Sequence, residues 1–314
     1  MTAPDPTEST DTEARIRTVT GPAPLSALSG RVLAHEHLRV DLRWPVGEGS
    51  DPRRWLDEEM HVTAELTGLR KEHDVSLVVE LSCVGMGRDA SALARISAGS
   101  RVAVVAGTGF FCEPFHPASI RDLTVERLAE RMMAEIGYGM DGTSVLPGVI
   151  GEIGTWGDQP TEREERVLRA AAQASVESGL PIATHGRAGL AQLELLMAEG
   201  VSPERVAVGQ QDLVEDPAVH RKIAETGAYV SFGNLALSSP ESARAAVDLI
   251  EAGHASRLLL SGGLSRMEQL RHYDGPGYGV LFTGVLPALR AAGVDEETLE
   301  LVTRTNALNW LSAA

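Results

Sequence analysis

The chain has 314 residues, 43% of them hydrophobic, and a formal net charge of −16 at pH 7. A chain of this size can bury a substantial core, and α/β barrels of this length commonly form one domain. Without a cluster of Lys and Arg, this acidic balance argues against nucleic acid and anionic membrane surfaces as partners. The two cysteines, Cys83 and Cys112, are too few for a disulfide framework and fit a reducing compartment.

The first residues, MTAPDPTESTDTEAR, are acidic and rich in Ser, Thr and Pro, with no hydrophobic signal core. No apolar stretch of the chain is long enough to span a bilayer. We therefore expect residues 1–16 to form a flexible acidic tail, residues 17–314 to form one domain, and the protein to be cytoplasmic.

Eight short apolar runs alternate with longer amphipathic segments from residue 31 onward. The runs cover residues 31–38, 75–82, 102–109, 147–154, 180–186, 205–211, 228–234 and 257–263. Strand and helix repeated eight times predict a parallel sheet closed into a (β/α)₈ TIM barrel. An open doubly wound sheet is the alternative, but no glycine-rich nucleotide-binding motif follows an early strand.

Two of the intervening segments carry clear helix boundary signals. Thr161 with Glu164 fits a capping box, and Gly179 fits the left-handed position after the last turn. Asp216 fits an N-cap followed by Pro217 at the first helical position. These signals support the alternation of strands and helices.

Ligand-type side chains stand at the ends of three predicted strands. His35 and His37 are two residues apart at the end of the first strand, so alternation places both imidazoles on the same face. Glu152 and His185 each end an apolar run, in the fourth and fifth strands. Three imidazoles and a carboxylate suit zinc or another first-row divalent ion.

Each of these residues also has a simpler interpretation. A lone histidine at a strand end is more often a hydrogen-bonded structural residue, and Glu152 alone could pair with an arginine. His61, His73, His220 and His254 fall in predicted helical segments, where we expect them to be solvated. The joint placement at the ends of three strands favours the metal site.

Several stretches resemble the phosphotriesterase family of the amidohydrolase superfamily. They are RTVTGPAPLSALSGRVLAHEHLRVDLR, GRDASALARI, VVAGTGFF, GTSVLPGVIGEIGT, PIATHGRAG, DGPGYG and VLPALRAAGVDEETLELVTRTNALNWL. The resemblance follows the order of the eight strands and covers nearly the whole chain. It implies a TIM barrel with a two-metal centre, hydrolysing phosphotriesters, lactones, esters or amides.

The resemblance also implies roles for the four ligand-type residues. His35 and His37 match the pair that holds the more buried metal, Glu152 matches the bridging ligand, and His185 matches a ligand of the second metal. Relatives that the chain resembles are commonly homodimers, so a homodimer is one expectation.

Two positions depart from the family pattern. Gln210 stands where the sixth strand usually supplies a histidine ligand, and Gly263 stands where the eighth strand usually supplies an aspartate that binds metal and accepts a proton. Two divalent ions would then share one carboxylate, a poor charge balance. We therefore predict one tightly held divalent ion, with zinc as the first choice, or none.

Three functions remain open from the sequence. The first is a hydrolase of a small ester, lactone or amide-like substrate with a mononuclear centre and a rebuilt base, for which Asp212 is the candidate. The second is a non-hydrolytic cyclase, lyase or isomerase, and the third is an inactive binding protein. The residues predicted to line the substrate pocket are Gln210, Gln211, Gly262, Gly263, Arg266 and Tyr273.

Overall fold

The computed structural model of the chain describes residues 13–43, 51–235 and 240–313. Eight parallel strands form one sheet in the order β12-β11-β10-β9-β8-β7-β6-β3. Their bounds are β3 (Arg31–Glu36), β6 (Val75–Glu80), β7 (Ala103–Thr108), β8 (Val149–Gly154), β9 (Ile182–His185), β10 (Val206–Val208), β11 (Tyr229–Phe232) and β12 (Leu258–Leu260). All eight predicted strands are present, which confirms the TIM barrel.

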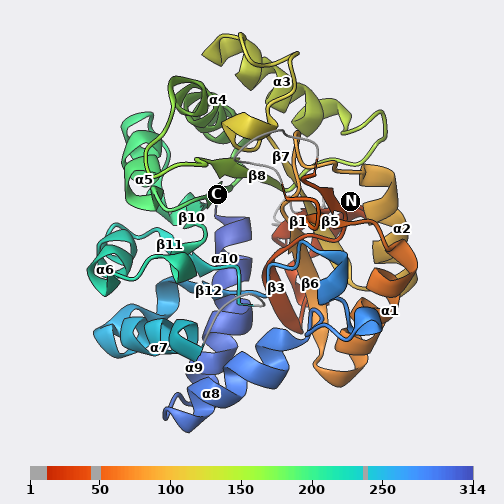
Figure 1. Cartoon of the computed structure of the whole chain (residues 1–314), viewed down its shortest axis with the longest axis vertical. Coiled ribbons are helices and arrows are strands. Elements are labelled where there is room, and N and C mark those ends of the chain that lie inside the picture. Colours follow the sequence, from red (N-terminus) through yellow and green to blue (C-terminus); the bar gives the residue numbers. More distant parts are fainter. Residues whose placement is uncertain (1–12, 44–50, 236–239, 314) are drawn as a thin grey trace, which may run out of the picture.

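Helices follow the strands and surround them (Figure 1). They are α1 (Glu59–Glu72), α2 (Ala90–Ser100), α3 (Val125–Tyr138), α4 (Glu162–Ser178), α5 (Gly189–Ala198), α6 (Pro217–Glu225), α7 (Pro240–Leu249), α8 (Leu286–Ala291), α9 (Glu296–Glu300) and α10 (Asn306–Ser312). The predicted caps are confirmed: Thr161 and Glu164 form a reciprocal capping box on α4, Gly179 is left-handed, and Asp216 caps α6 ahead of Pro217.

The strands separate two apolar clusters, as expected for a barrel with alternating side chains. The inner cluster includes Val32, Leu77, Val149 and Leu259, whereas the larger outer cluster packs the strands against the helices. Trp310 of α10 belongs to the inner cluster, and its Nε1 donates to the carbonyl of Arg205, just before β10 begins. Helix α10 therefore covers the end of the barrel where the strands begin, which leaves the opposite end for the site.

The strands at the two ends of the ladder order, β3 and β12, meet at a seam. The Glu36 carboxylate accepts hydrogen bonds from the Ser261 hydroxyl and from the backbone N–H groups of Gly262 and Leu264, at 2.8, 2.8 and 3.0 Å. The Gly263 N–H donates to the His35 carbonyl at 3.2 Å. These bonds fix the segment after β12 against the strand that carries the two histidines.

Two short hairpins were not predicted. Strands β1 (Arg15–Thr18) and β2 (Gly21–Pro24) pair antiparallel, and so do β4 (Val40–Asp41) and β5 (Trp55–Leu56). Ile16 is only 2% exposed. Arg15 and Ile16, which the sequence assigned to the tail, pair within β1. The rest of the expected tail, residues 1–12, lies outside the described residues.

No helix within the described residues has the length and apolar character needed to cross a membrane.

Candidate metal centre

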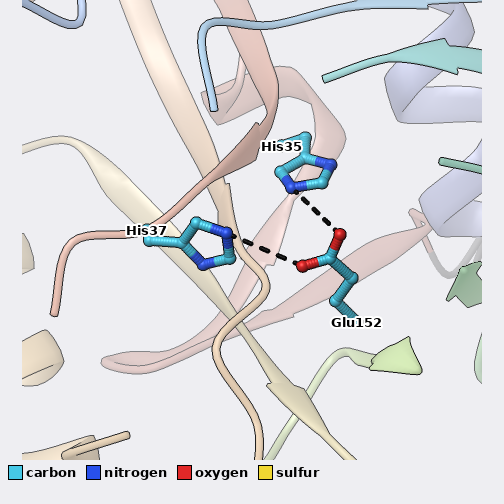
Figure 2. Close-up of side chains that lie close together, drawn as sticks. All are labelled: His35, His37 and Glu152. Carbon is cyan, nitrogen blue, oxygen red and sulfur yellow. Dashed lines mark ion pairs between the residues drawn. The ribbon is translucent and has the colours of Figure 1, made fainter. Parts of the chain in front are cut away.

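Three side chains from two strands converge where the strands end (Figure 2). The Nε2 atom of His35 lies 3.6 Å from Oε1 of Glu152, and Nε2 of His37 lies 3.7 Å from Oε2. Two ligand atoms bound to one zinc ion at a tetrahedral angle lie about 3.4 Å apart. The three side chains therefore fit one first-row divalent ion with little rearrangement.

A shift in strand pairing orients the histidines of β3. Val32 and Ala34 belong to the inner cluster, so strict alternation would direct His35 and His37 outward. The pairing of β3 with β6 shifts register between Leu33 and Glu36. The two imidazoles consequently face Glu152, and the simple alternation used in the sequence prediction does not explain their orientation.

A second irregularity orients Glu152 in β8. Val149 faces inward, and the β8–β9 pairing shifts register between Ile150 and Ile153. Gly151, within this shift, has φ +132°, and a Cβ there would lie 2.2 Å from the Ala183 carbonyl oxygen. Only glycine fits this close approach, so the residue before Glu152 is part of how the carboxylate reaches the centre.

Burial sets the protonation of the three side chains. His35, His37 and Glu152 are 3, 4 and 1% exposed. Burial lowers the pKa of His35 and lowers that of His37 to about 3, although Glu152 opposes both shifts. Burial alone would raise the pKa of Glu152, but His185, His35 and His37 outweigh it and hold the value at about 2. Neutral imidazoles with an ionised carboxylate are the forms that bind metal.

Ser82 holds the imidazole of His37 in place. It follows β6, is fully buried, and its Oγ lies 3.1 Å from Nδ1 of His37. This contact leaves Nε2 directed at Glu152, as in the outer-shell partners that fix ligand histidines. Ser82 was not predicted as a site residue, because its only signal in the sequence is its place at the end of a strand.

We expect Ser82→Ala to weaken zinc affinity about 10-fold, because an outer-shell partner of a ligand histidine is lost. Competition against a fluorescent zinc chelator measures the change. The matched control is Ser178→Ala, whose hydroxyl bonds the Ala174 carbonyl on α4, away from the centre. Equal affinities for Ser82→Ala and wild type would show that Ser82 does not position His37.

His185 occupies a different place from the other three. Its Nδ1 is hydrogen-bonded to Oε1 of Glu152, and Nε2 of Gln210 lies 2.9 Å from the same Nδ1. Among the described residues, the group whose ligand atoms all lie within 4.8 Å of one another is His35, His37 and Glu152, without His185. His185 therefore contacts the carboxylate rather than completing the group.

A cavity of about 420 Å³ opens beside His185. Its lining consists of Arg54, Thr155, Trp156, Asp158, His185, Gly186, Arg187, Gln210, Leu213, Asn234, Ser265 and Arg266. Gln210 and Arg266, two of the residues predicted for the substrate pocket, are part of this lining. Arg54 and Arg187 also line the cavity but were not predicted. The position of Arg187, two residues after His185, could have indicated it, whereas Arg54 lies in a loop without periodicity.

The sequence and the fold both have known counterparts. Residues 14–311 match the phosphotriesterase family. The phosphotriesterase homology protein of Escherichia coli is 35% identical over 285 residues, covering 88% of this chain and 96% of that protein. A crystal structure of a protein of that name, complexed with phosphate in its active site, superposes with a TM-score of 0.86 at 33% identity, over 90% of this chain and 99% of the other.

The chain belongs to the phosphotriesterase family. Two further members are similar to it over most of their length. The N-acetyltaurine hydrolase of Rattus norvegicus is 28% identical, covering 95% of this chain and 98% of that protein. The structure of a lactonase from Listeria monocytogenes has a TM-score of 0.87 at 25% identity, over 96% of this chain and all of that chain (100%).

Gly263, which the sequence resemblance aligned with the strand-8 aspartate, is not among the residues that line the cavity. It is buried with φ +64°, and a Cβ there would lie 1.6 Å from the carbonyl oxygen of Gly233. A Cβ on Gly233 would in turn lie 2.4 Å from Nδ1 of His35. The two glycines and the His35 ring pack directly together, so a side chain at position 263 would displace this backbone.

Four residues predicted for the substrate pocket do not line this cavity. Other protein atoms occupy the space beside Gly262 and Gly263 where a side chain would lie, so these glycines leave no room for a substrate. Gln211 is fully buried, and its Nε2 donates to the Gly209 carbonyl. Tyr273 is 38% exposed and donates to Glu58 next to α1. The sequence places all four after strands, but the turns following those strands direct them away from the cavity.

Asp212, the candidate base of this phosphotriesterase-family site, lies just after β10. Its Oδ2 accepts the Asn234 N–H at 3.1 Å, and its charge acts on His35 by raising the pKa of that imidazole. The carboxylate thus lies within electrostatic range of the centre, on the β11 side. Its role as a base stays a prediction.

Several residues outside the centre are structural. His220 was expected to be solvated, but it is only 2% exposed. Its Nε2 is hydrogen-bonded to the Gln211 carbonyl at 2.8 Å. Cys83 and Cys112 are fully buried, and burial raises the pKa of both thiols. Neither thiol is suited to nucleophilic or ligand chemistry.

Proposed function

We propose that this protein is a metal-dependent hydrolase with a single divalent ion, zinc first, acting on a small ester, lactone or amide-like substrate. The observation that most directly supports this proposal is the buried group of His35, His37 and Glu152. Its ligand atoms are spaced for one ion, and it lies beside an open cavity. A mononuclear site with three protein ligands keeps a position open for chemistry.

The side chains have different proposed roles according to where they lie in the site. His35, His37 and Glu152 would hold the ion, which when bound would polarise the scissile group and lower the pKa of water. Gln210 and Thr155 border the cavity as hydrogen-bonding groups that can orient a substrate. Asp212 would accept the proton, because Gly263 has no side chain for that role.

Two relatives support a hydrolase. One is named N-acetyltaurine hydrolase and the other lactonase, so amide and lactone substrates both occur among similar proteins. The proposal of a hydrolase rests on the similarity to these two proteins. The proposal of a single metal ion rests on the ligand residues of this chain. Gln210 is bonded to His185, where a second ion would need a ligand.

We expect one equivalent of metal per chain in protein purified without chelator. One carboxylate in a buried site cannot balance two divalent charges. Elemental analysis measures the stoichiometry in the protein as purified, and again in metal-free protein reconstituted with zinc, manganese or cobalt and then desalted. Two tightly held equivalents would refute the mononuclear centre, and activity with phenyl acetate, γ-butyrolactone and N-acetylglycine would define the substrate class.

A non-catalytic binding protein is the second candidate. The observation that favours it is the packing of Gly263 against Gly233, which leaves the usual base position filled by backbone. Reconstituted protein that binds one ion yet hydrolyses none of the three substrate classes would favour this candidate.

A further inference from the structure

The charges around the cavity are opposite in sign to the chain as a whole. Arg54, Arg187 and Arg266 line it with a single carboxylate, that of Asp158. The whole chain has 44 acidic residues against 28 Lys and Arg, a net charge of −16. Three arginines around one opening are therefore not a consequence of composition.

Arg54 is half-buried and forms no ion pair with an acidic residue in the part of the chain that the structure describes. Among the residues that the structure describes, its guanidinium has no hydrogen bond or ion pair, and it lies 5.8 Å from the centre of the Trp156 ring. Burial lowers its pKa, a shift that Glu152 opposes and Arg266 reinforces. A desolvated guanidinium costs free energy unless an anion pairs with it.

Arg88 shows how the same chain satisfies a buried arginine that has only a structural role. Its side chain is 2% exposed and forms ion pairs of 2.7 Å with both Glu135 and Asp141. Arg54 has no such pair within the described residues. Among the described residues, the Arg54 guanidinium is therefore left free to pair with a bound anion.

The other two arginines line the same cavity and also have unused donors. Arg187 is exposed, and no described residue forms an ion pair with it. Arg266 pairs with Asp51 at 2.8 Å, while its buried Nε has no hydrogen-bond partner within the described structure. Planar guanidinium groups bind carboxylate, sulfonate and phosphate oxygens in pairs of charge-assisted hydrogen bonds.

We propose that Arg54, Arg187 and Arg266 form an anion-binding subsite beside the metal centre. The substrate then carries a carboxylate, sulfonate or phosphate group on the part of the molecule that is not cleaved. This inference rests on the proposed hydrolase function and names the class of its substrate. Arg54 is the main specificity residue, because it is half-buried, forms no ion pair with a described residue and lies close enough to Glu152 for their charges to interact.

Binding of a simple anion tests the subsite without catalysis. The probe is ethanesulfonate, titrated calorimetrically into zinc-reconstituted protein, with ethanol as the neutral counterpart. We expect ethanesulfonate to bind and Arg54→Gln to weaken it at least about 10-fold, since hydrogen bonds between charged groups contribute about 1.5–3 kcal/mol. Arg187→Gln, at an exposed position, tests the same subsite if Arg54→Gln does not fold.

The matched control is Arg127→Gln, an exposed arginine paired with Glu130 on α3. It should leave ethanesulfonate affinity, zinc content and thermal midpoint unchanged. Equal affinity of wild type, Arg54→Gln and Arg187→Gln for ethanesulfonate, or no binding at all, overturns the subsite.

Two esters of equal length separate this inference from the hydrolase proposal. Phenyl hydrogen succinate has a free carboxylate, whereas phenyl pentanoate is neutral. We expect kcat/KM at least about 10-fold higher for the anionic ester, with the preference lost in Arg54→Gln. Equal hydrolysis of both esters by wild type overturns the subsite and leaves the hydrolase proposal intact. Ethanesulfonate binding that depends on Arg54, without hydrolysis of either ester, supports the subsite while the hydrolase proposal fails.

Discussion

Replacing Glu152 by glutamine should remove the metal and with it hydrolysis. Glutamine keeps the size of the side chain but loses the single carboxylate that faces His35 and His37, so an incoming divalent charge has no buried counter-charge. We expect zinc affinity and kcat/KM to fall by about 100-fold or more, because loss of an outer-shell partner alone costs 10–100-fold. Chelator competition and ester hydrolysis measure the two effects.

The same substitution at an exposed position of α4 is the control for this variant. Glu162 is 91% exposed, and Glu162→Gln should retain full metal content and activity. The folded state of Glu152→Gln can be checked by thermal unfolding without metal, since the amide oxygen can still accept from His185. A full equivalent of tightly bound zinc in Glu152→Gln would place the metal elsewhere in the protein.

The sequence predicts the barrel well because its signals are local and repeated. Each strand is a short apolar run, and the α4 and α6 boundaries depend on side chains that bond within one turn, such as Thr161 with Glu164. The β1–β2 hairpin escaped prediction because GPAP has little strand propensity. Its pairing depends on the tertiary position of Ile16, which no local pattern encodes.

The candidate centre was predicted in its residues but not in its geometry. Histidine spacing indicated a shared face, yet the actual orientation depends on register shifts in β3 and β8, which arise between strands. Gly151 is the one sign of the β8 register shift in the local sequence, since a glycine before Glu152 allows the close approach to Ala183. Periodicity within one strand cannot reveal such pairing.

Several residues predicted for the pocket do not line the cavity, because the turns after the strands direct them elsewhere. Gly263 was interpreted as open space, but it packs on Gly233, and that contact joins residues thirty positions apart. Arg54 was missed for the opposite reason, because its loop reaches the cavity only through tertiary structure. Which side chains reach the cavity is decided by loop conformation, whereas the ligand set follows from strand positions.

Glu164 is a buried carboxylate that connects several segments near the cavity. It is 1% exposed, and its oxygens accept the backbone N–H groups of Glu113, Trp156 and Thr161 at 3.1, 2.9 and 3.0 Å. One side chain thus connects the start of α4 with two loops, one of which carries Trp156 into the cavity lining. Capping explains only the bond to Thr161.

Glu164→Ala should therefore lower the free energy of unfolding by on the order of 3–9 kcal/mol, because three N–H groups lose their acceptor at about 1–3 kcal/mol each. Glu164→Gln keeps one acceptor oxygen, so we expect an intermediate loss. Chemical denaturation of metal-free protein measures both, with Glu162→Ala, an exposed change in the same turn, expected within about 0.5 kcal/mol of wild type. If Glu164→Ala matched that control, the three N–H groups would have other acceptors and Glu164 would serve only as a helix cap.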